Sequence, residues 1–223
     1  MTNGEYIGAG SGTTKLLLHL NGNSTDSSGN GNNGIDTAIT YVDGKFGKCA
    51  SVAGTGRIVT TSNIGITGQG ARTIAGWFNC QTQPSVDQYL FTLGKLSAGN
   101  LFALKYSSVK KGGFSLYGTD LVTTSVLTPL TSVGWHFICI TYSGGALSSS
   151  SLKFSIDGVD YPFASYSGTP NTTDFTVSIG DYGNNSGYGW KGYFDEVIIE
   201  NRAWSAQEVK KYYTQSRGFF ATL

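Results

Sequence analysis

Two neighbouring stretches decide the fold: WHFICITY at residues 135–142 and LKFSIDGVDYPF at residues 152–163. The first is a continuous apolar run of strand length, which predicts a central strand buried on both faces. The second contains Asp157-Gly158, a pair that supplies the positive φ angles of a tight two-residue turn. Together the two stretches predict antiparallel strands, the second folded into a hairpin. His136 lies inside the first strand, where we expect a hydrogen-bonded strand residue rather than a base or a ligand.

Similar short strands are expected along the rest of the chain, at the spacing typical of a β-sandwich. They cover residues 15–20, 46–53, 57–61, 72–80, 89–93, 101–106, 114–117, 175–179 and 192–200. In residues 72–80, we expect Ile74, Phe78 and Cys80 on one face and Ala75 and Trp77 on the other, because side chains alternate along a strand.

A single helix is expected near the C-terminus. Ser205 and Glu208 have the spacing of a capping box, and Val209, Tyr212 and Tyr213 then fall on one helical face. The polar, Gly-rich residues 1–14 predict a flexible N-terminal arm. Residues 15–223 predict a single domain, because no linker and no fixed-period repeat divides them.

The charge balance excludes several classes of protein. Charged residues make up 13% of the 223 residues and the net charge is +1, so the chain has no basic footprint for nucleic acid. No segment approaches the about 20 apolar residues of a membrane span, and the N-terminus lacks the pattern of a signal peptide. We therefore expect neither nucleic-acid binding nor membrane insertion.

The three cysteines are Cys49, Cys80 and Cys139. Their odd number and wide spacing fit neither a disulfide framework nor a zinc motif. Cys80 and Cys139 lie in apolar strands, where a free cysteine is expected to pack as a small hydrophobic residue. The sequence leaves open a disulfide bond between two of the three cysteines.

Four segments carry a resemblance to a known family. They are the stretches 16–34, 44–49, 135–158 and 192–209, of which the last, from Gly192-Tyr193-Phe194-Asp195-Glu196 onward, is the most specific. The chain resembles the concanavalin A-like lectin/glucanase superfamily, in its laminin-G-like jelly-roll branch. The resemblance implies an all-β fold, a two-sheet antiparallel jelly-roll sandwich, here with one short C-terminal helix. It does not imply one function, because its members bind glycans, mediate adhesion, build virions or accompany enzymes.

Catalysis is not expected. The glucan-hydrolysing branch of the superfamily uses Glu-x-Asp-x-Glu on one strand, and paired carboxyl groups about 5 Å apart act as nucleophile and acid. The chain has only four glutamates, Glu5, Glu196, Glu200 and Glu208, and none belongs to that motif. We interpret Glu196 and Glu200 as outward, solvated residues.

A structural calcium ion is one hypothesis for the loop that follows the first strand. Residues 21–34 are rich in oxygen ligands suited to Ca²⁺, and members of the family often carry this ion. Asp195 is expected on the core face with Val197 and Ile199, where an ionised carboxylate needs hydrogen bonds or a cation. Asp26, Asn30 and Asp195 are therefore the candidate metal ligands. In the alternative, Asp26 makes an Asx-turn and Asp195 accepts backbone amides. Arg57, which stands where the family usually has an aspartate, favours this alternative.

The loop at residues 181–190 is the candidate ligand site. Tyr182, Tyr188 and Trp190 offer flat faces for sugar rings, and Asp181, Asn184 and Asn185 offer hydrogen-bonding groups. In the alternative, the loop is a Gly-rich turn whose aromatic rings fold back onto the core.

These observations predict a non-enzymatic binding or adhesion module that contacts glycans or a host surface polymer. The resemblance to stand-alone, phage-encoded members of the family implies a virion surface location, as a capsid decoration or tail-associated protein, with a homo-oligomer as one arrangement. The alternatives are a purely structural virion protein that docks on other virion proteins and, least favoured, a glycoside hydrolase.

Overall fold

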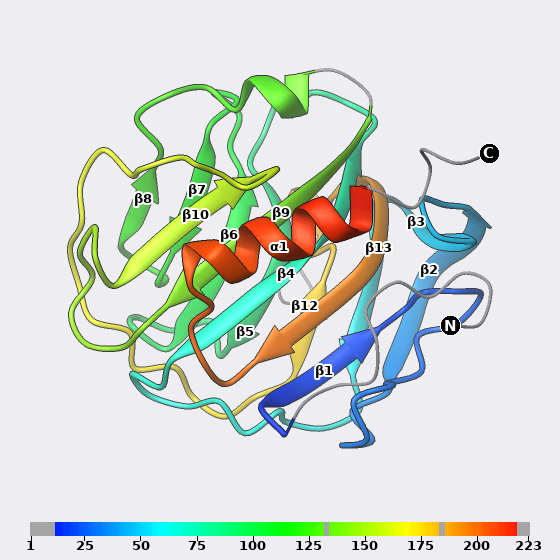
Figure 1. The fold of residues 1–223 in the computed structure, drawn as a ribbon, viewed down its shortest axis with the longest axis horizontal. Coiled ribbons are helices and arrows are strands. Elements are labelled where there is room, and N and C mark those ends of the chain that lie inside the picture. The colour runs from blue at the N-terminus through cyan, green and yellow to red at the C-terminus, as the bar shows by residue number, and fades with distance from the viewer. Residues whose placement is uncertain (1–11, 132–133, 183–185, 218–223) are drawn as a thin grey trace.

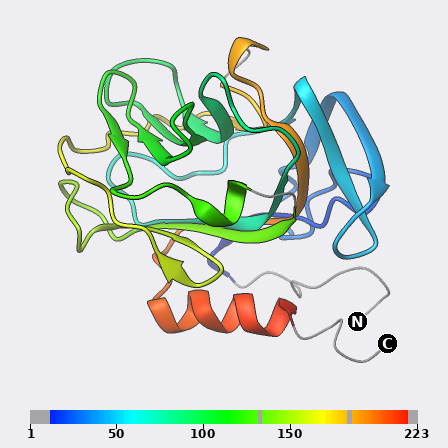
Figure 2. The same cartoon turned by 90° about the horizontal axis from the view of Figure 1, so that it is seen from above.

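The strands form one continuous antiparallel ladder that curls into two layers (Figures 1 and 2). The computed structural model describes residues 12–131, 134–182 and 186–217. The first layer contains, in order, β11 (Val159–Asp160), β10 (Leu152–Ile156), β9 (Trp135–Tyr142), β4 (Arg72–Cys80), β13 (Lys191–Glu200) and β1 (Thr14–Leu18). The second contains β12 (Val177–Ile179), β5 (Gln88–Gly94), β6 (Leu101–Tyr106), β7 (Gly112–Ser115) and β8 (Asp120–Val122). The predicted all-β sandwich is confirmed, whereas the predicted arm at 1–14 lies largely outside the described residues.

The long strand β3 (Lys48–Thr60) joins the two layers. Its first half pairs with β13 and its second half with β12, while β2 (Gly34–Asp43) follows it along both halves. Gly54 lies between the halves with φ of 89°, a conformation that favours glycine. Sequence analysis predicted two strands around residues 54–56; the structure has one strand that bends there.

The main core lies between the layers. Its largest fully buried side chains include Phe78 of β4, Phe102 of β6 and Phe194 of β13. The expected alternation along residues 72–80 is confirmed, since Ile74, Phe78 and Cys80 face this core while Ala75 and Trp77 face the other way. All three cysteines are free and buried.

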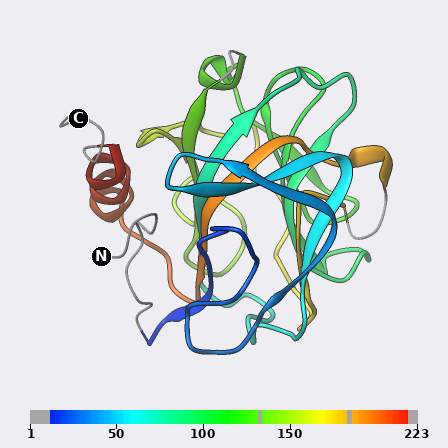
Figure 3. The same ribbon diagram turned by 90° about the vertical axis from the view of Figure 1, so that its right-hand side faces the viewer.

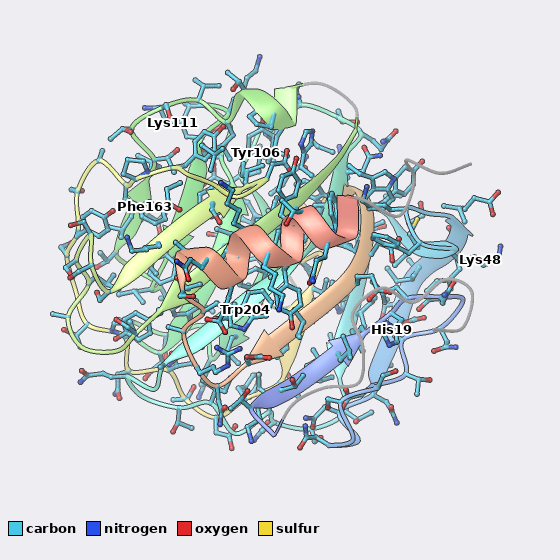
Figure 4. The ribbon with its side chains drawn as sticks, in the orientation of Figure 1. His19, Lys48, Tyr106, Lys111, Phe163 and Trp204 are labelled. Carbon is cyan, nitrogen blue, oxygen red and sulfur yellow. The ribbon has the colours of Figure 1, made fainter. Side chains whose placement is uncertain are left out.

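The outer face of the first layer is covered by α1 (Ala206–Arg217), as Figures 2 and 3 show. Val209, Tyr212 and Tyr213 pack there on a second apolar cluster that contains Trp77, as the helical spacing predicted. Trp204, labelled beneath the helix in Figure 4, stacks on Tyr212 with ring centroids 4.2 Å apart.

The capping box at the start of α1 is confirmed. The backbone N–H of Ser205 donates to Glu208 Oε2 at 2.8 Å, and the N–H of Glu208 donates to Ser205 Oγ at 3.2 Å. Within the described residues, no helix is long and apolar enough to cross a membrane.

The hairpin around Asp157-Gly158 is also confirmed, with φ of 54° and 76° at the two residues. Asp157 additionally holds the start of β9, because its carboxylate accepts from the Phe137 N–H at 2.9 Å and pairs with His136 Nδ1 at 2.8 Å. His136 is therefore the hydrogen-bonded strand residue that the sequence predicted.

A β-bulge in β13 overturns the expectation that Asp195 faces the main core. Glu196 has φ of 50°, and the pairing of β13 with β4 shifts register between Asp195 and Ile198. The extra residue places Asp195 opposite Trp77, away from the face of Val197 and Ile199 where simple alternation put it.

Glu196 and Glu200, expected to be solvated, are 0% and 2% exposed. Glu196 pairs with His19, whose place beside β1 Figure 4 shows, with His19 Nδ1 2.9 Å from its Oε2. Glu200 accepts hydrogen bonds from Trp204 Nε1 and from the guanidinium of Arg202 at 2.8 Å each. These partners compensate the burial of both carboxylates: His19 comes from the other end of the chain, whereas Arg202 and Trp204 come from the segment directly after β13.

Candidate functional site

The outer face of the second layer carries the candidate site. Side chains alternate along β6, so that Phe102 and Leu104 enter the main core while Leu101, Ala103 and Lys105 face outward. Ser115 of β7 lies on the same outer side, opposite Ala103 and Asp120 in the ladder. Unlike the face beneath α1, this face is not covered by the helix.

Four tyrosines gather on this outer face. Tyr89 comes from β5, Tyr117 from the turn between β7 and β8, and Tyr182 and Tyr188 from the segment between β12 and β13. The ring of Tyr182 lies 4.2 Å from that of Tyr89 and 5.9 Å from that of Tyr188, measured between centroids. It is also nearly parallel to the ring of Tyr117, at 10° and 6.5 Å. We call these four residues the tyrosine cluster.

The tyrosine cluster borders a hollow of about 510 Å³. Its lining consists of the four tyrosines together with Ser115, Gly118 and Asp120. Tyr89 is only 5% exposed and forms the base, whereas Tyr117 and Tyr188 are 41% and 39% exposed. Aromatic faces beside a few polar groups are the usual composition of a small-molecule site.

An ion cluster around the buried Lys105 includes Asp120 of the lining. Lys105 Nζ lies 2.7 Å from Asp87 Oδ2 and 2.6 Å from Asp120 Oδ2, and the lysine side chain is only 4% exposed. Burial alone would lower the pKa of Lys105, but the hydrogen bonds to Asp120 and Asp87 outweigh it and raise the pKa. Burial likewise opposes ionisation of Asp87, but Lys105 and the Ser108 amide lower its pKa. Lys105 is therefore protonated and Asp87 is ionised near neutral pH.

The structure brings together only part of the predicted ligand loop. Tyr182 and Tyr188 belong to the tyrosine cluster, whereas Asn184 and Asn185 lie outside the described residues. Asp181 is 2% exposed and lies 3.8 Å from the guanidinium of Arg57, so it anchors the loop. This contact gives Arg57 a partner in the position where the family usually has an aspartate.

The prediction that Trp190 faces a ligand is wrong. Trp190 is 0% exposed and packs against Phe78 and Phe194 in the main core. The alternative of a ring folded back onto the core therefore describes Trp190 but not Tyr188. The backbone explains the difference, because the Trp190 N–H donates to the Gly180 carbonyl at 2.8 Å and closes the loop at that point.

Sequence reasoning missed Tyr89, Tyr117, Lys105 and Asp120. Alternation along residues 101–106 would have placed Lys105 on the outer face, but it does not show which residues of other strands meet there. Tyr117 has φ of 60°, a left-handed conformation that nothing in its neighbouring sequence predicts.

The residues proposed for calcium do not fit the ion. Asp26 Oδ1 accepts the N–H groups of Leu17 and Ser28, and Oδ2 accepts the Ser28 hydroxyl and the Asn32 N–H, all at 2.8 to 3.0 Å. The side-chain amide of Asn30 donates to the Thr14 carbonyl, so it presents N–H groups at that point. Protein donors thus occupy the oxygens that a cation needs, and the Asx-turn alternative describes Asp26.

Asp195 is held separately, with Oδ2 accepting the N–H groups of Lys45 and Phe46 at 2.9 Å each. Its Oδ1 has no hydrogen-bond partner among the described residues, and burial raises the pKa of this carboxyl to about 8. Across the described parts of the chain, no three His, Cys, Asp or Glu residues are grouped to hold a metal ion.

Comparison with known proteins identifies the family and the fold. A model described as the concanavalin A-like lectin/glucanases superfamily, of the laminin-G type, matches residues 52–210. No curated protein sequence matches the chain.

Solved structures share the fold at low sequence identity. Domain 4 of AbnA, an extracellular GH43 arabinanase from Geobacillus stearothermophilus solved with arabinotriose, superposes with a TM-score of 0.70 at 17% identity. The match covers 89% of this chain and 97% of that domain.

Two toxin binding domains are also similar. That of Paraclostridial Mosquitocidal Protein 1 has a TM-score of 0.70 at 16% identity, and the match covers 90% of this chain and 52% of the other. A structure of botulinum neurotoxin type C, whose cell entry depends on two ganglioside molecules, has a TM-score of 0.67 at 13% identity and coverage of 92% and 51%. This chain thus spans about half the length of the toxin domains.

Proposed function

Because the chain belongs to the concanavalin A-like lectin/glucanases superfamily, we propose that it is a non-catalytic module that binds saccharides in the hollow beside the tyrosine cluster. The observation that carries the proposal is the convergence of four tyrosine rings on the outer face of the second layer, around a hollow of about 510 Å³. Aromatic rings offer broad apolar faces at a small cost in conformational entropy. The apolar C–H face of a sugar ring packs against such surfaces.

Polar groups at the rim would fix the orientation of a bound sugar. The Asp120 side chain is 50% exposed, and the exposed Tyr117 and Tyr188 carry phenolic hydroxyls that donate and accept hydrogen bonds. Sugar hydroxyls match these groups because each also donates and accepts. Two similar folds point in the same direction, since one was solved with arabinotriose and another belongs to a toxin that depends on gangliosides.

The absence of a catalytic role is part of the proposal. Glu196 and Glu200, the glutamates of β13, are buried and hydrogen-bonded to His19 and Arg202 respectively. They lie in the first layer, while the tyrosine cluster lies on the outer face of the second. We expect no release of reducing ends from any polysaccharide that the protein binds.

The test is a glycan array followed by calorimetry on each glycan that binds. We expect Tyr117→Ala and Tyr188→Ala to weaken binding by about tenfold or more each, because stacking on a ring contributes on the order of 1–3 kcal/mol by analogy with base stacking. The matched control is Phe175→Ala, since Phe175 is 48% exposed but does not line the hollow. Binding that all three variants retain, or no binding to any glycan, overturns the proposal.

Location on a phage virion remains a prediction that rests on the resemblance alone. Its test is association of the purified protein with particles, together with light scattering for its mass. A blank glycan array combined with stable association on particles would favour the alternative of a structural docking protein.

A further inference from the structure

The exposed charge at the tyrosine cluster is negative. Among the described residues that line the hollow, Asp120 is the one charged residue, and none is a lysine or an arginine. Half of the Asp120 side chain is exposed, whereas Lys105 beneath it is only 4% exposed. A ligand in the hollow therefore meets a carboxylate and not the ammonium group that pairs with it.

The surrounding charges do not reverse this sign. Lys105 pairs with both Asp87 and Asp120, so one cation faces two anions and the cluster keeps a net negative charge. Arg57 is engaged by Asp181 at 3.8 Å. The centres of the tyrosine faces also carry negative electrostatic potential, because an aromatic ring has a negative face and a positive edge.

From this arrangement we propose that the site selects uncharged saccharides and rejects acidic ones, with Asp120 as the specificity-determining residue. The inference rests on the proposed function. The Asp120 carboxylate accepts hydrogen bonds from the hydroxyls of a neutral sugar, and such charge-assisted bonds are stronger than bonds between neutral groups. A uronate or sialate carboxylate brought beside it suffers like-charge repulsion, which no cation among the described lining residues compensates.

The experiment compares sugars that differ mainly in charge. The probes are lactose with 3′-sialyllactose, and methyl-esterified with de-esterified oligogalacturonides, measured by calorimetry at low and at high salt. We expect the wild-type protein to bind the neutral member of a pair at least about tenfold more tightly, a difference of about 1.4 kcal/mol. The preference should shrink at high salt, because ions screen the repulsion at an exposed site.

Variants assign the preference to Asp120. Asp120→Asn should reduce the discrimination several-fold, whereas Asp120→Glu should retain it because the charge is kept. Asp43→Asn makes the same change in net charge on the exposed strand β2 and should leave the preference unchanged. Thermal unfolding of each variant checks that the fold persists.

The outcomes separate this inference from the proposed function. If the acidic members bind as tightly as the neutral ones or more tightly, and Tyr188→Ala abolishes this binding, the charge selection is overturned while the tyrosine site stands. A neutral preference that persists unchanged in Asp120→Asn overturns the role of Asp120. No binding of any probe or array glycan overturns the proposed function and this inference with it.

Discussion

Lys105 reaches Asp120 across an intervening strand. The two residues belong to β6 and β8, β7 lies between these strands, and yet Lys105 Nζ is 2.6 Å from Asp120 Oδ2. Gly113 of β7 stands opposite Lys105 in the ladder. A Cβ atom at Gly113 would lie 2.5 Å from Lys105 Cγ and 2.7 Å from Cε. The lysine stem therefore crosses β7 in the space that glycine leaves.

Gly113→Ala is expected to displace this stem and weaken both ion pairs of Lys105. We expect the free energy of unfolding to fall by about 1–3 kcal/mol, the range for overpacking a filled site, as measured by urea denaturation. Gly134→Ala is the control, because the nearest atom to a Cβ there is 3.6 Å away. Equal stability of the two variants would show that the Lys105 side chain does not need the space at Gly113 to cross β7.

Lys105→Met removes the cation and leaves Asp87 and Asp120 without their shared partner. Losing one partner of a fully buried pair costs about 3–5 kcal/mol. We expect a loss on the order of 2 kcal/mol here, because half of Asp120 is exposed and solvent screens it. Urea denaturation at pH 7 measures the loss, and a change below about 0.5 kcal/mol would contradict the role of the ion cluster.

The stability difference between wild type and Lys105→Met should also depend on pH, because Lys105 shifts the pKa of Asp87. Its pKa is lowered in the folded state because Lys105 and the Ser108 amide outweigh burial. This stabilisation is therefore present above the unfolded pKa, near 4, and is lost as the pH falls through the folded pKa. The stability difference between wild type and Lys105→Met should shrink as the pH falls from about 5 to about 2; a constant difference would exclude this linkage.

Asp195→Asn should change how stability depends on pH. Burial raises the pKa of Asp195 to about 8 in the folded state, so the folded protein holds a proton that the unfolded chain releases near pH 4. The wild-type stability should therefore decline as the pH rises from about 4 to about 8, and the decline should level off above that.

Asparagine does not titrate, so the Asp195→Asn variant lacks the part of this decline that Asp195 causes in the wild-type protein. Because one pKa unit corresponds to about 1.4 kcal/mol, we expect the stability of Asp195→Asn relative to wild type to increase by a few kcal/mol between pH 5 and pH 8. Urea denaturation at several pH values in this range measures it. Parallel pH profiles would show that Asp195 is already ionised at pH 5.

Calcium is expected to leave the stability unchanged. The oxygens of Asp26 accept four hydrogen bonds from protein donors, so a cation would have to break them to bind. Thermal unfolding with millimolar CaCl₂ and with EDTA should give the same Tm, within about 1 °C. A clear rise in Tm with calcium would restore the metal hypothesis for this loop.

Local chemistry made several elements predictable. Asp157-Gly158 specifies its own turn, and Ser205 with Glu208 specifies the start of α1, because each depends on residues that are neighbours in the chain. The alternation of side chains between the two faces in residues 72–80 could be predicted equally well, because β4 has no bulge and pairs with β9 in unbroken register. Of the aromatic residues predicted to bind a ligand, Tyr182 and Tyr188 line the hollow, whereas Trp190 is buried in the main core.

The sequence by itself determined the fold class, the strands of the central ladder, the hairpin and the capped helix, because alternation and turn chemistry act over a few residues. Only the tertiary structure decided the bulge at Glu196, the bend of β3 across both layers and the tyrosine cluster with its buried lysine. These features arise where strands distant in the chain are brought together. There, pairing register and packing determine which side of the sheet a residue faces and which charges become its neighbours.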